Sequence, residues 1–171
     1  LSVYFKEAKE SNMLVEEFML LANKRVAEYI GKDEINTTGH KRAPKTFVYR
    51  IHDKPSEERY EKFATFIRRF GYEAMPQKDE VISNAVNRVL SEAKGKGEQN
   101  LVEVLALRTM AKAAYSTKNI GHYGLAFPYY THFTSPIRRY PDMMVHRLLF
   151  SYINGGNSVN ADEYEEKCKH C

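Results

Sequence analysis

The longest uninterrupted helical pattern, residues 11–30, is the feature that most narrows the folds open to this chain. The segment SNMLVEEFMLLANKRVAEYI has Ser11 or Asn12 as a candidate N-cap and Gly31 as its stop. At about 100° per residue, one broad side of this helix is apolar and has to be covered by other elements. That side carries Leu14, Val15, Phe18, Ala22, Val26 and Tyr29.

The polar residues of the same helix fall into two groups. Glu17, Lys24 and Glu28 form a stripe that we expect to be solvated. Glu16 and Asn23 are seven residues apart and therefore point the same way, among the apolar side chains of the opposite face. A carboxylate and an amide in such surroundings need hydrogen-bonding partners.

The remaining segments predict an α+β domain in which helices pack on a small antiparallel sheet. Residues 32–46 are polar and predict a loop, and the alternating segment TFVYRIH (46–52) predicts a strand. Pro55 opens a helix that ends at Gly71, with Phe63, Phe66, Ile67 and Phe70 as its apolar face. Further helices are predicted at 79–93 and 100–114, separated by the flexible segment KGKGEQN.

Length and composition exclude several classes of protein. The 171 residues suffice for one domain, and 43% hydrophobic and 28% charged residues are typical of globular chains. No apolar run approaches the roughly 18 residues of a membrane span. Two cysteines fit a reducing compartment, so a cytoplasmic location is expected. The chain lacks an initial Met and stops at CKHC, which suggests an excised fragment of a longer protein.

Residues 117–154 combine positive charge with aromatic rings. Four Lys and Arg residues stand against Asp142 alone, with three of the six His and eight aromatic residues among them. Cations can contact phosphates and flat rings can stack on bases, so this composition favours a surface for single-stranded nucleic acid. An aromatic-rich core strand with a basic rim is the alternative.

Two prolines shape the segment THFTSPIRRYPDMMVHRLL (131–149). Pro136 fits the start of a turn, and Pro141 ends that turn and opens a second helix, with Asp142 in its first turn. Arg138 and Arg139 are thus displayed on a proline-bracketed elbow, where a guanidinium can clamp a phosphate. Alternatively, the two arginines are structural and bind carbonyl groups of the elbow.

The segment HYGLAFPYYTHFTSPIRRYPDMMVHRLL resembles the signature of the RNB exoribonucleases, the family of ribonucleases II and R. LVEEFMLLANKRVAEYI, FVYRIHDKP and LRTMAKAAYSTKNIGHYGLA also occur in the order and spacing of that family. The resemblance covers residues 11–171, and the wording THFTSPIRRYPD is closer to ribonuclease R. It implies that residues 1–171 are the C-terminal portion of an RNB-type catalytic domain.

The resemblance implies a processive 3′→5′ exoribonuclease that hydrolyses single-stranded RNA to nucleoside 5′-monophosphates. Members of the family use Mg²⁺ held by a cluster of Asp residues upstream of these motifs. The five Asp residues of this chain are scattered singly, so no metal ligand is assigned here. We therefore expect the fragment alone to be inactive and its parent to be monomeric. An RNA-binding piece of a catalytically dead RNB-like protein is the alternative.

The family motif assigns roles to individual residues. Arg138 matches the catalytic arginine, and Glu16 or Glu17 matches a glutamate that contacts the ribose; the shared face with Asn23 favours Glu16. The weaker candidates for RNA contact or for shaping the elbow are Asn23, His132, Thr134, Ser135, Arg139 and Tyr140. His146 is expected to be structural, and the Cys168–Cys171 spacing is too isolated to indicate a zinc site.

Overall fold

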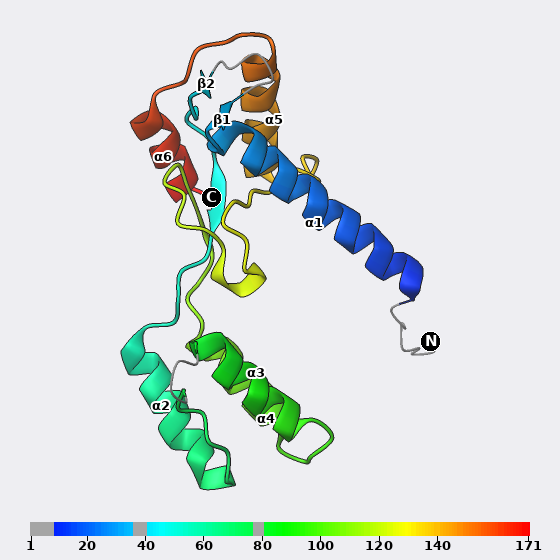
Figure 1. The fold of residues 1–171 in the computed structure, drawn as a ribbon, viewed down its shortest axis with the longest axis vertical. Helices are drawn as coiled ribbons and strands as arrows, with labels where there is room; N and C mark the ends of the chain where they lie inside the picture. The colour runs from blue at the N-terminus through cyan, green and yellow to red at the C-terminus, as the bar shows by residue number, and fades with distance from the viewer. Residues whose placement is uncertain (1–8, 36–40, 77–80) are drawn as a thin grey trace. The chain divides into compact units, whose positions relative to one another are not determined.

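The computed structural model describes residues 9–35, 41–76 and 81–171, which belong to two compact units (Figure 1). Unit 1 joins the chain before Lys54 to the chain after Lys112, and unit 2 is the segment between them, Lys54–Lys112. Each unit has its own cluster of buried apolar side chains. The predicted α+β class is confirmed, since helices dominate and the strands form only small antiparallel sheets.

Unit 1 is built around a two-stranded antiparallel sheet of β3 and β4. Tyr49 lies opposite Ser116 in this sheet, and Ile51 lies opposite Ala114. A second antiparallel pair joins β1 and β2, and helix α6 packs against β4. The elements of the unit are α1 (Glu10–Gly31), β1 (Glu34–Ile35), β2 (Lys41–Arg42), β3 (Tyr49–Ile51), β4 (Ala114–Ser116), η2 (Tyr123–Leu125), α5 (Tyr140–Ile153) and α6 (Ala161–Lys169).

Helix α5 supplies the largest share of the core of unit 1. Its buried side chains meet the end of α1, the strand region 47–49 and α6. Two side-chain hydroxyl groups also bind backbone carbonyls of the segment that leads into β3. Tyr152 donates to the Thr46 carbonyl (2.8 Å), and Thr131 donates to the Val48 carbonyl (2.7 Å). The core consists of Ala27, Ile30, Phe47, Val48, Tyr49, Met144, Val145, Leu148, Tyr152 and Cys168.

Unit 2 is a group of helices with a separate core. Its elements are α2 (Glu57–Ile67), η1 (Arg68–Phe70), α3 (Ile82–Ala93) and α4 (Gln99–Thr109). Tyr60, Phe63, Ala64 and Ile67 follow the spacing of one helical face and are buried, whereas Phe66 and Phe70 remain exposed. The predicted stop at Gly71 is confirmed, since this residue has the left-handed φ of 85° that favours glycine.

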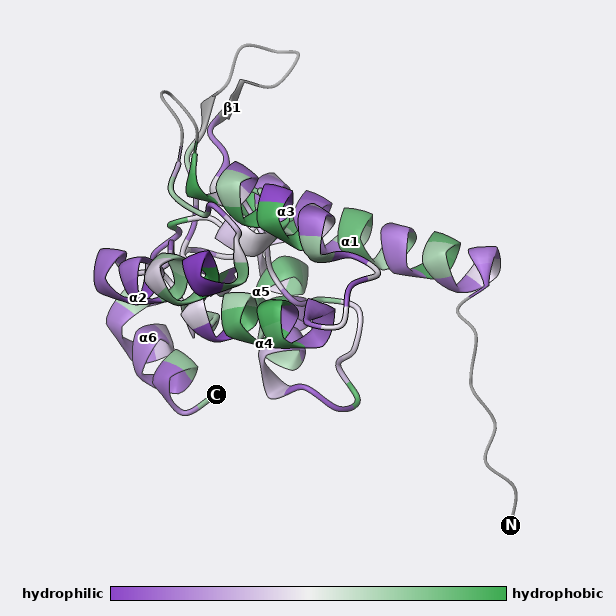
Figure 2. Cartoon of the chain, turned by 90° about the horizontal axis from the view of Figure 1, so that it is seen from below, coloured by the Kyte–Doolittle hydropathy of each residue, from purple (hydrophilic) through white to green (hydrophobic). Residues whose placement is uncertain are grey.

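The buried face of α1 differs from the predicted one. Leu14, Val15 and Phe18 are exposed, and Figure 2 shows hydrophobic residues continuing along this helix toward its N-terminal end. The buried residues are Asn23, Ala27, Glu28 and Ile30, all in the second half of the helix. None of the helices in the described part of the chain has the length and apolar character needed to cross a membrane.

Two further predictions for α1 are corrected. The N-cap is Lys9 rather than Ser11 or Asn12, and the Asn12 side chain instead accepts the Lys9 backbone N–H. Glu28 is buried rather than solvated, between Arg25 (3.2 Å) and Lys32 (3.1 Å). Burial raises the pKa of Glu28, but the hydrogen bond and the charge of Lys32 outweigh it, so the pKa lies below its ordinary value.

Element boundaries elsewhere differ in detail. The predicted loop 32–46 contains the β1–β2 pair, while its Thr-Thr-Gly stretch lies outside the described residues. The predicted strand is confirmed but shorter, at Tyr49–Ile51. The helix predicted from residue 79 begins at Ile82, with 79 and 80 outside the described residues. The helix predicted to reach residue 114 ends at Thr109, because Ala114 already pairs with Ile51 as β4.

Leu148→Ala tests the core of unit 1. Leu148 is 2% exposed, so truncation removes buried contacts and leaves a cavity, and we expect a loss of about 2–5 kcal/mol of unfolding free energy. Phe150→Ala on the same helix is the control, because Phe150 is 73% exposed and should change stability by less than about 0.5 kcal/mol. Urea unfolding followed by circular dichroism measures both. Equal losses would contradict this assignment of the core.

Candidate active site

The segment between the two prolines forms the expected elbow. Residues 136–138 are a turn in which the Ser135 carbonyl accepts the backbone N–H groups of Arg138 (3.3 Å) and Arg139 (3.2 Å). Helix α5 then begins at Tyr140, with Pro141 in its first turn. Proline is favoured there because its missing N–H would have no partner within the helix. The two arginines therefore lie on a short, sterically restricted connection.

A buried carboxylate fixes the second arginine. Asp142 is 0% exposed, and its Oδ2 accepts hydrogen bonds from Arg139 Nη2 (2.9 Å) and from the Ser135 backbone N–H (2.7 Å). Arg139 Nε also lies 2.9 Å from Asp142 Oδ1. A buried carboxylate needs such compensation, and the guanidinium supplies it with one hydrogen bond, from Nη2 to Oδ2, and a close charge contact of Nε with Oδ1. The charge of Arg139 is thus committed to the interior of the elbow.

Asn23 connects α1 to the residues that precede the elbow. Its side chain is buried, and Oδ1 accepts the successive backbone N–H groups of Phe133 (2.9 Å) and Thr134 (3.2 Å). Nδ2 donates to the Tyr130 hydroxyl (3.1 Å). The sequence argument that this amide needs partners is confirmed. With so little surface exposed, Asn23 is better suited to holding the elbow than to contacting RNA directly.

Phe133 is held from its other side by α5. The His146 ring stacks on the Phe133 ring at 4.1 Å, and His146 Nε2 lies 2.9 Å from the Phe133 carbonyl oxygen. The predicted structural role of His146 is confirmed by these contacts.

Among the described residues, the Thr134 hydroxyl is buried without a hydrogen-bond partner.

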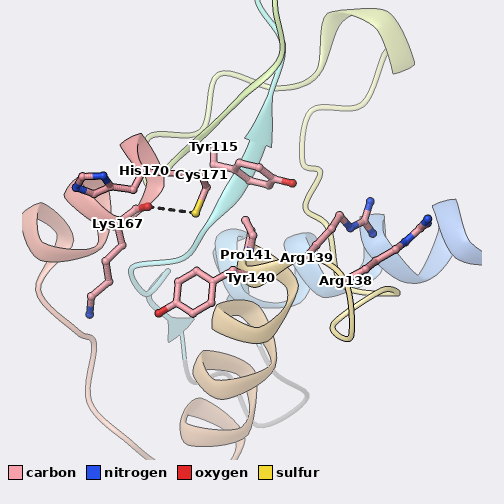
Figure 3. A pocket seen from close by; sticks show the side chains of 8 residues that line it. All are labelled: Tyr115, Arg138, Arg139, Tyr140, Pro141, Lys167, His170 and Cys171. Atoms are coloured by element: carbon pink, nitrogen blue, oxygen red, sulfur yellow. Dashed lines mark hydrogen bonds between the residues drawn. The ribbon is translucent and has the colours of Figure 1, made fainter.

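The elbow borders a cavity of about 520 Å³ within unit 1 (Figure 3). The Arg138 side chain is exposed there, and its guanidinium makes no hydrogen bond or ion pair with any described residue. In Figure 3, the Arg138 and Arg139 side chains lie on one side of the cavity, and Lys167 and His170 of the α6 region lie on the other. The lining residues are Tyr115, Arg138, Arg139, Tyr140, Pro141, Lys167, His170 and Cys171.

Tyr115 forms the part of this lining that comes from β4. Its ring receives the Arg50 guanidinium at 4.6 Å, and its hydroxyl lies 2.7 Å from His132 Nδ1. Burial and the positive charges of Arg139 and Arg50 lower the pKa of His132 to about 4. His132 is therefore neutral at pH 7, and its contact with Tyr115 is an uncharged hydrogen bond.

A second histidine is kept neutral in the same unit. Burial, together with the neighbouring His52 and Arg50, lowers the pKa of His122 to about 4. The His52 and His122 rings lie 5.0 Å apart, and the His122 and Tyr130 rings meet edge-on at 5.3 Å. These rings form an aromatic and imidazole cluster, in which Tyr130 is largely buried.

Comparison with known proteins places the chain in a family. The RNB domain matches residues 1–155. The chain belongs to the RNB family. Ribonuclease R of Aquifex aeolicus is 37% identical over 154 residues, which are 90% of this chain and 20% of that protein. The chain therefore spans about a fifth of the length of this curated relative.

Two solved structures have a similar fold. Mycoplasma genitalium RNase R, in complex with ribose-methylated single-stranded RNA, is 27% identical to this chain, with a TM-score of 0.71. The match covers 99% of this chain and 25% of the RNase R chain. Yeast Ssd1, described as a pseudonuclease, is 26% identical to this chain, with a TM-score of 0.70. That match covers 94% of this chain and 19% of the Ssd1 chain.

Several of the residues predicted for the RNB site converge on the elbow. Asn23, Thr134, Ser135 and Arg139 share one hydrogen-bond network around Asp142 and the 133–135 backbone. Arg138 and the exposed Tyr140 line the cavity. Whether these residues contact RNA remains a prediction.

Glu16 lies apart from this network. It is exposed on α1, two turns or roughly 10 Å along the axis from Asn23. It shares the side of the helix that Asn23 turns toward the elbow, whereas Glu17 is rotated by about 100°. This placement is consistent with the preference for Glu16 over Glu17 as a ribose contact, which also remains a prediction.

The described residues do not fit the Mg²⁺ ions implied by the family. They contain no group of three or more His, Cys, Asp or Glu side chains that could hold a metal ion. Asp142 is committed to Arg139, Cys168 is buried, and Cys171 Sγ donates to the Lys167 carbonyl (3.2 Å).

Four of the cavity residues and one ion pair were not predicted from the sequence. The four residues come from segments without a local signal for this site, and they are Tyr115, Lys167, His170 and Cys171. The pair between Arg139 and Asp142 was detectable, because opposite charges three residues apart at a helix start lie side by side. The sequence pattern alone predicts for Asp142 only a favourable position at the start of a helix.

The neutral state of His132 predicts a specific pH dependence of stability. Its pKa is about 4 in the folded protein and about 6.5 in an unfolded chain, so between these values only the unfolded chain takes up the proton. The unfolding free energy should therefore be complete above about pH 6.5 and fall as the pH decreases toward 4. His132→Gln should weaken this fall, as urea unfolding at about pH 7 and about pH 5 can show.

His170→Gln is the matched control, because His170 is exposed at the end of α6. This variant should keep the pH dependence of the parent. His122 contributes in the same direction as His132, so the dependence should not vanish in His132→Gln. An unchanged pH dependence in His132→Gln would show that His132 is not held neutral by the fold.

Proposed function

We propose that this chain is part of a processive 3′→5′ exoribonuclease that hydrolyses single-stranded RNA to nucleoside 5′-monophosphates. In this proposal, Arg138 contacts the scissile phosphate and stabilises the charge that develops on it in the transition state. The Mg²⁺ ligands belong to parts of the longer protein outside this chain. A monomeric parent in the cytoplasm completes the proposal.

The observation that carries the proposal is the contrast between the two arginines. Arg139 is neutralised by the buried Asp142, whereas the Arg138 guanidinium is exposed at the cavity and unpaired among the described residues. A free, planar guanidinium on a fixed turn is suited to a two-pronged contact with a phosphate. Membership in the RNB family and the likeness to an RNase R bound to single-stranded RNA support RNA as the ligand.

A second candidate is an RNA-binding part of a catalytically inactive RNB protein. The likeness to yeast Ssd1, a pseudonuclease, favours keeping this candidate, since the fold is shared by both kinds of protein. The two candidates differ in the upstream Asp cluster that would bind the metal ions. Its presence in the sequence that precedes this chain would favour the nuclease.

Arg138→Ala in the full-length protein tests the role of this residue. Loss of a preorganised donor to the transition state costs on the order of 3 kcal/mol, so single-turnover cleavage should slow by about a hundredfold or more. Arg138→Lys should also be impaired, because it keeps the charge but loses the planar fork. RNA affinity should fall much less, since other phosphate contacts persist.

Arg139→Ala is the matched comparison on the same turn. It leaves Asp142 buried without its cation, so it should mainly lower stability, as thermal unfolding can measure. Its folded fraction should cleave faster than Arg138→Ala. If Arg138→Ala cleaves at the parental rate while a folded Arg139→Ala is inactive, the two roles are assigned to the wrong residues.

The isolated 171-residue chain should not hydrolyse RNA. No cluster of metal ligands is found among its described residues, and hydrolysis in the proposed mechanism needs metal ions held elsewhere in the parent. Incubation of labelled single-stranded RNA with the chain and Mg²⁺ should release no nucleotides above background. Release of mononucleotides that stops on addition of a chelator would contradict this expectation.

A further inference from the structure

We propose that Asn23 is a positioning residue for Arg138, acting from α1 through the backbone of the elbow. The inference rests on the proposed function, because it assigns Asn23 a part in catalysis only if Arg138 has one. It concerns the Oδ1 atom of the amide, which accepts two consecutive backbone N–H groups just before the turn.

The local geometry makes Asn23 difficult to replace. Asn23 is 4% exposed, and its partners Phe133 and Thr134 lie 110 and 111 residues further along the chain. These two residues are not part of a helix or strand, so no neighbouring strand satisfies their backbone N–H groups. A buried amide donor without a partner costs about 1–3 kcal/mol, and the segment would relax toward other acceptors if Oδ1 were removed.

The backbone just before the turn is anchored to two helices. Asn23 fixes the backbone at 133 and 134, and Asp142 fixes the next N–H, that of Ser135, whose carbonyl caps the turn carrying Arg138. Asp142 reaches Ser135 from α5, whereas Asn23 is the described side chain that ties this backbone to α1. Loss of the Asn23 contact removes the tie to α1 and leaves residues 133 and 134 without an acceptor for their N–H groups, although Thr131 and His132 remain bonded to the strand region. A displacement of about 1 Å at a reacting group can slow a reaction by up to a hundredfold.

A double-mutant cycle in the full-length protein tests the coupling. Asn23→Ala alone should slow single-turnover cleavage at saturating RNA by about tenfold, with a smaller change in RNA affinity. In the Arg138→Ala background, the same substitution should slow cleavage by less than about twofold, because the group that it positions is already gone. Rates are compared per folded molecule, with the fold checked by circular dichroism.

Three variants separate positioning from a loss of stability. Asn23→Asp keeps an oxygen acceptor for both N–H groups and can also accept from the Tyr130 hydroxyl, and these three hydrogen bonds compensate the buried carboxylate. It lowers stability more than it lowers the rate, so it should restore most of the rate per folded molecule. Tyr130→Phe removes only the partner of Nδ2 and should cleave at nearly the parental rate. Leu148→Ala destabilises the same unit without touching the elbow and should also keep its rate per folded molecule.

The possible outcomes are distinguishable. A parental rate for Arg138→Ala would refute the proposed function itself. If Arg138→Ala is impaired and Asn23→Ala slows it by a further tenfold, the two residues act independently and the positioning role is wrong. The role is also wrong if Asn23→Asp is as slow as Asn23→Ala. Should Asn23→Ala fail to fold, Asn23→Ser enters the same cycle with the same expectations.

Discussion

The buried carboxylate of Asp142 is the constraint on which the candidate site depends. A carboxylate with no exposed surface must be compensated by charge and hydrogen bonds, and here Arg139 and the Ser135 N–H provide both. These partners lie three and seven residues before it, on the far side of Pro141 and of Pro136 respectively. Satisfying one buried charge therefore folds the chain back on itself and creates the elbow. Arg138, between the two partners, is left pointing outward.

This arrangement divides two adjacent arginines into a structural and a free one. Two neighbouring cations would repel each other if both were unpaired, but the Arg139 charge is cancelled by Asp142. The nearby histidines add no further charge at neutral pH, since His122 and His132 have pKa values of about 4. Arg138 therefore carries the uncompensated positive charge that the elbow presents at the cavity. An anionic ligand can reach it there.

Much of the local structure could be predicted from the sequence, because it depends on local rules. Proline at residues 136 and 141 fixed the elbow and the start of α5, α1 ends at Gly31, and Gly71 ends the 3-10 helix η1 that follows α2. Strand β4 escaped prediction, because three residues that follow a helical pattern carry too weak a signal, and their pairing with β3 spans more than sixty residues. The partner of Asn23 was unpredictable for the same reason, although its need for one was evident.

The first half of α1 shows why the prediction of its buried face was wrong. A hydrophobic pattern states which side of a helix is to be covered, but not by which part of a protein. In this chain, the residues of α1 that are buried within unit 1 are Asn23, Ala27, Glu28 and Ile30. Asn23 is held there by hydrogen bonds, Glu28 by ion pairs, and Ala27 and Ile30 by apolar packing. The large side chains of the predicted face, including Leu14 and Phe18, remain exposed. Packing at the elbow thus buries the side of α1 that carries Asn23, whose Oδ1 accepts the backbone N–H groups of Phe133 and Thr134.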